Sequence, residues 1–280
     1  MLRIAIPNKG ALAEHAVDLL QAAGYAGRRD TKTLYILDTR NEVEFFYLRP
    51  RDIATYVGAG ALDVGITGRD LLIDSGSEAL EVGPLNFGNS TFRFAGPPGQ
   101  FKEIQDLEGK RVATSYIGLV EGFLAAQGVS ANLVKLDGAV ESAVQLGVAD
   151  AVADVVDTGS TLKAAGLELF GPVALESTAV LISSPTAASD GVHHFLRRLQ
   201  SVLVAREYVL MDYDLPAALV EQATAITPGF ESPTISPLRD ADWVAVRVMV
   251  PRRDHNQIMD RLEALGARGI LVTPIHSARM

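Results

Sequence analysis

The sequence predicts an α/β protein with a two-lobed core and a smaller C-terminal domain. An apolar strand, a loop and an amphipathic helix open the chain over residues 2–24, and a second strand restarts this pattern at 110–116. Near the C-terminus, valines at alternate positions over 244–250 are typical of a strand with one buried face. Strands that alternate with helices form sheets covered by helices, so each restart indicates a new sheet.

Length and composition are those of a globular enzyme. With 280 residues, of which 48% are hydrophobic and 21% charged, the chain can form two or three cores. We find neither a basic, apolar leader nor an apolar run of the ~18 residues that a membrane helix needs, so we expect a cytoplasmic protein without a membrane partner. The absence of cysteine excludes disulfides, thiolate nucleophiles and cysteine metal sites. A net charge of −9 argues against nucleic-acid binding, so an anionic ligand requires a local positive site.

The first candidate for that site is a loop lysine. Leu2–Ile6 forms a strand that Pro7 ends, and Asn8-Lys9-Gly10 precedes a helix with one apolar face. Ligands of open α/β sheets bind at the carboxyl ends of strands, where Lys9 lies. The alternative is a lysine that is simply solvated.

A second cation follows the strand 43–48. Arg49 stands at its end, Pro50 stiffens the turn into a helix, and Asp52 is suited to capping that helix. A guanidinium binds phosphate groups through its fork of N–H donors. In the alternative interpretation, Arg51 and Asp52 form a surface pair that contributes little.

The central stretch, residues 141–162, combines a strand with a phosphate-binding turn. The strand carries Val152 and Asp154, and Thr158-Gly159-Ser160-Thr161 opens the next helix. Backbone N–H groups at such a turn converge on one point, and the hydroxyl groups add donors. Asp154, with Asp157 nearby, suits a sugar whose hydroxyls must be held, so the stretch favours a ribose 5-phosphate. The alternative is that Thr158 only caps the helix and Asp154 satisfies a turn.

A weak internal likeness indicates two matching lobes. Residues 60–72 and 147–162 both run from a glycine through an aspartate and a strand to a glycine-bearing turn. We expect Pro97-Pro98-Gly99 to mark the crossing between the lobes, and the ligand to lie where both present loops. Asp70 then belongs to the first wall and Tyr116 to the second, although a capping aspartate and a buried tyrosine are the ordinary alternatives.

The remaining segments predict structure without catalysis. Residues 168–184 read as a strand pair, and 193–209 as a helix whose adjacent His193 and His194 point in different directions, which disfavours a metal site. From about Tyr213 the order is β-α-β-β-α-β, a ferredoxin-like unit. From the residues alone this unit could be an interface, a partner mount or an effector sensor.

The central stretch also resembles the signature of the ATP phosphoribosyltransferase family. The fixed positions of that signature are met by Glu141, Gly147, Ala149, Val152, Asp154, Val155, Thr158, Gly159, Thr161 and Leu162. The resemblance extends to P-N-K-G at 7–10, R-P-R-D-I-A-T-Y-V at 49–57, D-V-G-I-T-G-R-D-L-L at 63–72 and A-T-A-I-T-P-G-F-E-S-P-T-I at 223–235.

This resemblance implies a fold and its boundaries. It implies a core like that of type II periplasmic binding proteins, with a C-terminal ferredoxin-like (ACT-like) regulatory domain. The expected ranges are 1–92 and 183–210 for lobe I, 93–182 for lobe II and 211–280 for the regulatory domain.

It also implies a reaction: transfer of phosphoribosyl from phosphoribosyl pyrophosphate to N1 of ATP, the first step of histidine biosynthesis. The catalytic residues implied are Lys9, Arg49 and Asp154. Expected contacts of the phosphoribosyl donor are Glu141, Asp154, Val155, Asp157, Thr158, Gly159, Ser160 and Thr161, and those of the nucleotide are Lys9, Gly10, Asp70, Leu71 and Tyr116. Mg²⁺ would arrive mainly on the substrates, without a confident side-chain ligand.

For regulation, the resemblance implies feedback inhibition by histidine, with contacts at Asp214, Ser232 and Thr234. It implies dimers that assemble into hexamers, without the partner protein resembling histidyl-tRNA synthetase on which short forms depend. Two alternatives stay open: a non-catalytic two-lobed binding protein, and an amino-acid sensor.

Overall fold

The computed structural model describes residues 1–27, 32–157, 159–187 and 189–279. It divides into a first unit, residues 1–21 and 25–194, and a second unit, residues 22–24 and 195–280. The boundary falls within helix α7 (Ser189–Glu207). Within the described ranges, no helix combines the length and the apolar character needed to cross a bilayer.

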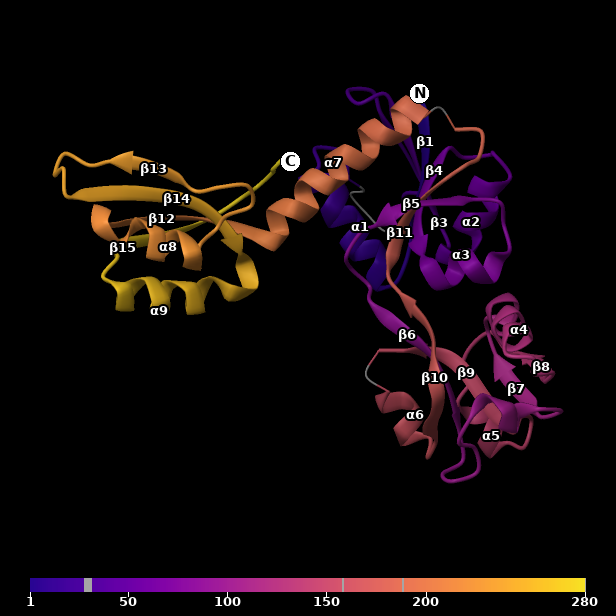
Figure 1. Cartoon of the computed structure of the whole chain (residues 1–280). Coiled ribbons are helices and arrows are strands. Elements are labelled where there is room, and N and C mark those ends of the chain that lie inside the picture. Colours follow the sequence, from indigo (N-terminus) through magenta and orange to yellow (C-terminus); the bar gives the residue numbers. More distant parts are fainter. Residues whose placement is uncertain (28–31, 158, 188, 280) are drawn as a thin grey trace. The chain divides into compact units, whose positions relative to one another are not determined.

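The first unit contains two sheets, each with helices in its connections (Figure 1). The first sheet has the order β2-β3-β1-β4-β11-β5. Its strands are β1 (Leu2–Pro7), β2 (Tyr35–Asp38), β3 (Val43–Leu48), β4 (Val64–Gly68), β5 (Leu80–Pro84) and β11 (Ala179–Ser183). Its helices are α1 (Ala11–Ala22), α2 (Pro50–Gly58) and α3 (Arg69–Ser75). Ile53, Ala54 and Val57 of α2 pack with residues of β1 and β11 in one buried cluster, which holds the helix on the sheet.

The second sheet has the order β10-β6-β9-β7-β8. Its strands are β6 (Ser90–Gly96), β7 (Arg111–Thr114), β8 (Asn132–Lys135), β9 (Ala151–Val156) and β10 (Glu168–Ser177). The helices are the 3₁₀ turn η1 (Ile104–Leu107), α4 (Ile117–Ala126), α5 (Ser142–Gln145) and α6 (Ser160–Ala164). Phe92, Phe94, Phe101 and Phe170 are the buried phenylalanines of its core.

Both sheets repeat one topology. In each, β1 or β7 pairs in parallel with β3 or β8 and with β4 or β9. The strand that follows the crossing, β11 or β6, is antiparallel and lies between β4 and β5 or between β9 and β10. This is the type II order, and it confirms the internal likeness: residues 60–72 hold β4 and the start of α3, and residues 147–162 hold β9 and the start of α6.

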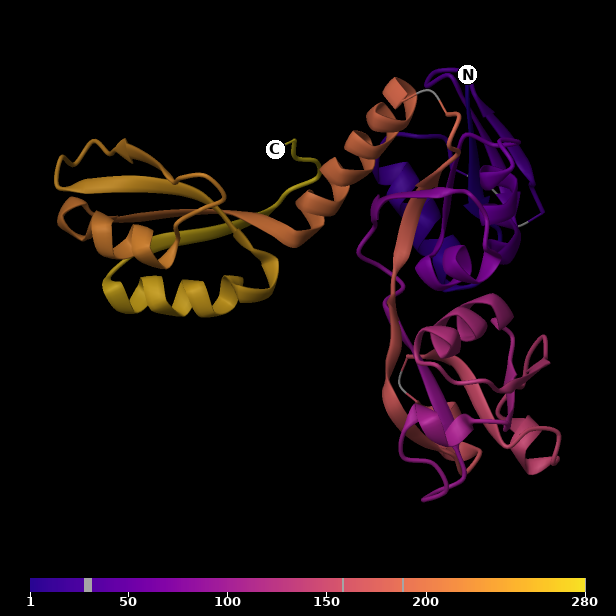
Figure 2. The same cartoon turned by 45° about the vertical axis from the view of Figure 1, so that its right-hand side comes forward.

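The crossing between the lobes lies earlier than expected. β6 already belongs to the second sheet, so Pro97-Pro98-Gly99 is a turn within lobe II and its assignment to the crossing is wrong. Two segments cross side by side (Figure 2): Leu85 donates its N–H to the carbonyl of Ala179, and Ala179 donates to Phe87. Residues 90–92, which we expected in lobe I, therefore lie in the second sheet. Residues 179–182, which we expected in lobe II, lie in the first sheet.

The second unit is the expected ferredoxin-like domain. Its antiparallel sheet has the order β13-β14-β12-β15, formed by β12 (Tyr208–Pro216), β13 (Thr234–Pro237), β14 (Trp243–Pro251) and β15 (Arg268–Pro274). Helices α8 (Val220–Ile226) and α9 (His255–Leu265) are each preceded by a 3₁₀ turn, η2 (Ala217–Leu219) and η3 (Arg252–Asp254). Alternate residues of β12 and β14 are buried with Ile258 and Leu262 of α9 in a core of its own. Its sheet begins at Tyr208, slightly before the expected domain start at residue 211.

Some local expectations need adjustment. The short strand β2 was not among the strands expected from the sequence, because its four residues are too few to show a clear periodicity. Helix α2 starts at Pro50 with Arg49 at its N-cap and without a side-chain capping bond, so Asp52 is in the first turn and is not the cap. Helix α7 starts at 189 and ends at 207, earlier at both ends than expected.

Candidate active site

The two lobes of the first unit share a cleft of about 370 Å³ at the ends of their strands. From lobe I it is lined by Lys9 and Gly10 after β1, and by Asp70 and Leu71 after β4. From lobe II it is lined by Tyr116 after β7, and by Val155 and Asp157 at the end of β9. Seven of the expected contact residues therefore lie around one cavity, at the carboxyl ends of parallel strands.

The candidate phosphate turn after β9 includes one residue in the left-handed conformation. Gly159 is the N-cap of α6 and has a φ of 72°, a left-handed conformation that glycine adopts without strain. Ser160 and Thr161 follow with exposed side chains, whereas Thr158 lies outside the described residues. Because α6 has only five residues, local N–H groups and hydroxyls would bind an anion here, with little help from a helix dipole.

Asp154 is partly buried at the end of β9. Its Oδ1 accepts the N–H of Val155 at 2.8 Å. Burial raises the pKa of Asp154 above that of an ordinary aspartate; the Val155 hydrogen bond and the charge of Arg51 oppose this, whereas the Glu141 and Asp70 carboxylates add to it. The carboxylate is thus held in a costly environment, as is common at functional sites.

This raised pKa has a consequence for stability. The folded protein holds the proton of Asp154 more tightly than the unfolded chain does. The free energy of unfolding therefore falls as the pH rises from the pKa of Asp154 in the unfolded chain through its higher pKa in the folded protein. We expect Asp154→Asn to be more stable than the wild type at neutral pH, with a difference that shrinks toward pH 3. Thermal unfolding of both proteins across pH 3–8 measures this; a wild type that gains stability relative to the variant as the pH rises would contradict it.

Tyr116 and Asp70 face each other across the cleft. Burial, followed by the Asp70 carboxylate, raises the pKa of Tyr116, which therefore stays protonated. Its ring packs edge-on against the ring of Phe92, with 5.3 Å between the two ring centroids. Asp70 is 7% exposed, accepts the hydroxyl of Ser177 at 2.8 Å and donates its N–H to the same Ser177 oxygen at 3.0 Å. No side chain caps α3, so Asp70 is not a capping residue.

The arginines behave differently from expectation. Arg49 is exposed at the N-cap of α2 and is not among the residues that line the cleft, and its role stays a prediction. Arg51 pairs with Asp74 at 2.5 Å and lies over the Tyr116 ring at 4.6 Å, so its interpretation as a surface partner of Asp52 is wrong. Sequence reasoning missed Arg51 and Asp74 as a pair because 23 residues separate them.

Other acidic residues near the motif have structural partners. Asp150 bonds the side chain of Arg111, which holds the pKa of Asp150 below its usual range, and also accepts the backbone N–H of Arg111. Glu141 is the N-cap of α5 and acts on Asp154 through its charge. Among the described residues, no group of three His, Cys, Asp or Glu side chains could hold a metal ion; His193 and His194 are exposed on α7.

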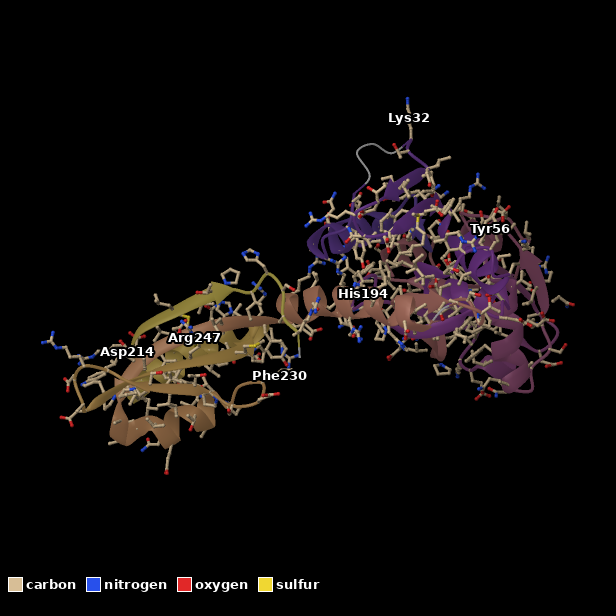
Figure 3. All side chains as sticks on the ribbon, turned by 90° about the horizontal axis from the view of Figure 1, so that it is seen from above. Lys32, Tyr56, His194, Asp214, Phe230 and Arg247 are labelled. Atoms are coloured by element: carbon tan, nitrogen blue, oxygen red, sulfur yellow. The ribbon has the colours of Figure 1, made fainter. Side chains whose placement is uncertain are left out.

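The expected inhibitor contacts are spread over the sheet of the second unit, where Figure 3 marks Asp214 and Arg247. Asp214 lies opposite Ala245 on the face that α8 and α9 leave open, whereas Thr234 lies opposite Arg247 on the far side of β14. Two strand spacings separate Asp214 from β13, about 10 Å. Ser232 precedes β13. The three residues therefore do not meet in one cluster within a single chain.

Comparison with known proteins assigns the family. A sequence profile described as ATP phosphoribosyltransferase matches residues 49–201. The chain belongs to the ATP phosphoribosyltransferase family. A second profile, described as HisG, C-terminal domain, matches residues 205–277, which include the ferredoxin-like domain.

Full-length relatives agree. The ATP phosphoribosyltransferase of Arthrobacter sp. strain FB24 is 62% identical over 286 aligned residues, and that of Streptomyces coelicolor is 58% identical over 285, each covering 100% of both chains. Among solved structures, the ATP phosphoribosyl transferase (HisG:HisZ) complex from Thermotoga maritima aligns with a TM-score of 0.64 and 27% identity, over 73% of this chain and 99% of that one. This ATP phosphoribosyltransferase family member is thus a glycosyltransferase of histidine biosynthesis whose substrates are ATP and phosphoribosyl pyrophosphate.

Proposed function

We propose that the cleft between the lobes holds both substrates and that its residues divide the reaction among them. The observation that carries this proposal is the single cavity lined by Lys9 and Asp70 from one lobe and by Tyr116 and Asp157 from the other. Bond exchange between two substrates requires both to be held in contact, and such positioning is a major source of rate enhancement.

The phosphoribosyl donor lies on lobe II. Its 5-phosphate takes the N–H groups and hydroxyls of the turn from Thr158 to Thr161, supported by the left-handed Gly159. Asp154 accepts hydrogen bonds from the ribose hydroxyls. The remaining contacts on this side are Glu141, Val155, Asp157 and Ser160.

The chemistry is a displacement at the anomeric carbon. Pyrophosphate leaves while positive charge grows on the ribose ring, and a nitrogen of the adenine, N1, attacks. The Asp154 carboxylate stabilises that charge more strongly than it would in water, because burial lowers the local dielectric. Lys9 and Arg49 bind the departing phosphates; both side chains are exposed and can reach an anion.

The acceptor lies between the walls. Asp70 and Leu71 from α3 and Tyr116 from the start of α4 line the same cavity as Lys9 and Gly10. The buried Asp70 carboxylate is suited to accept from an amino or a hydroxyl group of the nucleotide, since two carboxylate oxygens can accept more hydrogen bonds than the one that the Ser177 hydroxyl donates.

Mg²⁺ fits this site as a companion of the substrates. The described residues offer no cluster of three ligands, and Mg²⁺ commonly uses one or two carboxylates together with substrate phosphates. Bound in that way, Mg²⁺ would supply positive charge beside the pyrophosphate leaving group. The exposed carboxylate of Asp157 at the cleft is the candidate protein contact.

Removing the metal tests that point. We expect excess EDTA to abolish pyrophosphate release from ATP and phosphoribosyl pyrophosphate, and excess Mg²⁺ to restore it. The direct assay of the proposed function is the same mixture, with pyrophosphate and the ribosylated nucleotide as products. Undiminished turnover in EDTA would remove Mg²⁺ from the proposal, whereas binding of both substrates without any product would contradict catalysis in this cleft.

The second unit is proposed as a histidine-binding regulatory domain. It has its own sheet and core and carries no site residue of the transfer reaction, which fits an effector-binding module. Its expected contacts are Asp214, Ser232 and Thr234, and the chain works as a homo-oligomer, from dimer to hexamer, without a second kind of protein. Turnover by the purified chain alone tests whether a second kind of protein is needed. Sedimentation with and without histidine measures the mass of the oligomer and tests the proposed assembly from dimer to hexamer.

A further inference from the structure

Helix α4 starts without a capping side chain of its own. Its N-cap residue is Tyr116, whose side chain makes no capping hydrogen bond. Asp74 supplies the missing acceptor: its Oδ1 accepts the N–H of Gly118 at 2.9 Å and that of Leu119 at 3.3 Å. These are the N–H groups that a local N-cap residue would satisfy. Asp74, however, belongs to α3 of lobe I, so one lobe caps a helix of the other.

The same carboxylate holds an arginine against the cleft tyrosine. Oδ2 of Asp74 lies 2.5 Å from Nη1 of Arg51, and the side chain of Asp74 is only 10% exposed. The Arg51 guanidinium lies over the Tyr116 ring, with its Cζ 4.6 Å from the ring centroid. Nη2 of Arg51 lies 3.5 Å from the hydroxyl oxygen of Ser115. One buried carboxylate therefore connects α2 and α3 of lobe I with the start of α4 in lobe II.

The backbones also approach closely at this point. A Cβ added to Gly118 would lie 2.5 Å from the carbonyl oxygen of Asp74, closer than real Cβ atoms come to backbone. The φ of Gly118 is outside the left-handed region, so this glycine is needed for proximity and not for its conformation. Glycine is a poor helix former, which makes the close contact the physical reason for its presence in α4.

We propose that Asp74, Arg51 and Gly118 form an interlobe latch that holds Tyr116 at the nucleotide wall. This inference rests on the proposed ATP site, which is lined by Asp70 of one lobe and Tyr116 of the other. A ligand that touches both lobes binds only the fraction of molecules in which the lobes are joined, so its apparent affinity falls with that fraction. Asp74 is a positioning residue here, because it acts through Arg51 and Tyr116.

The sharpest test uses two glycines of the same helix. Gly118→Ala inserts a methyl group between the lobes, whereas Gly122→Ala places it in open space, and both changes favour the helix itself. We expect Gly118→Ala to raise the dissociation constant of ATP, measured by calorimetry without the ribosyl donor, and the KM for ATP by about tenfold. Gly122→Ala should leave both unchanged. ATP affinity equal to the wild type in Gly118→Ala would overturn the latch.

Substitutions of Asp74 give an independent measurement. Asp74→Asn keeps an acceptor for the α4 N–H groups but loses the charge that holds Arg51, and Asp74→Ala loses both. The KM for ATP should therefore rise from wild type to Asn to Ala, while kcat changes less than KM. A fall in kcat and in melting temperature with an unchanged KM would show an ordinary structural cap and overturn the proposal.

A third ligand separates this inference from the proposed function. Ribose 5-phosphate, placed on lobe II alone, should bind the Gly118→Ala and Asp74→Ala variants as it binds the wild type, but should bind Asp154→Ala more weakly. Equal loss of ribose 5-phosphate and ATP binding in the latch variants would indicate a damaged lobe and overturn the latch. Wild-type ribose 5-phosphate binding in Asp154→Ala would instead contradict the proposed donor site.

Discussion

Asp154→Ala is expected to lower kcat by about 10²–10³-fold, the loss that follows when one preorganised group that stabilises transition-state charge is removed. The effect is large because this carboxylate is partly buried beside the cleft, where solvent cannot substitute for it well. Steady-state rates of pyrophosphate release with saturating ATP and donor measure it. Histidine binding should stay intact, because Asp154 and the ferredoxin-like domain belong to separate units.

The matched control for Asp154 is Glu121→Gln. Glu121 is an exposed carboxylate on α4 of the same lobe, outside the residues that line the cleft. It should keep the wild-type rate. Wild-type turnover in Asp154→Ala would remove the ribose-binding role from this residue.

Ending the chain at Glu207 is expected to abolish inhibition by histidine. A cut near Met211 would divide β12, the strand that pairs with both β14 and β15, whereas a cut at Glu207 removes the whole sheet and its core. Because the two catalytic sheets take no strand from this domain, the cut leaves all their strands paired. Rates with and without millimolar histidine measure the effect.

A substitution in the full chain guards against a truncated protein that fails to fold. Asp214→Asn removes a charge from the open face of the sheet, and we expect the inhibitory concentration of histidine to rise by about tenfold or more, the effect of losing a hydrogen bond to a charged group. Asp240→Asn is the control, an exposed carboxylate between β13 and β14. If the truncated enzyme is still inhibited, the effector site lies outside the C-terminal domain.

Much of the fold follows from local patterns. The repeated strand-turn-helix segments at 60–72 and 147–162 contain β4 and β9, and the alternating valines of 244–250 lie in β14. These predictions succeed because side-chain periodicity and turn chemistry are set by neighbours along the chain. The turn at 97–99 was misassigned for the same reason: proline and glycine show where a strand ends, but not to which sheet it belongs.

The proposed donor site is likewise local, since Asp154, Val155 and the turn after them are consecutive. The sequence alone determined the family, the two-lobed plan and the C-terminal domain, and it predicted the phosphate turn. Only the tertiary structure decided that Asp74 caps α4 across the lobes, that Arg51 lies over Tyr116, and that Asp70 bonds Ser177, 107 residues away. Such contacts depend on how separate elements pack, and no pattern of neighbouring residues encodes the distance between them.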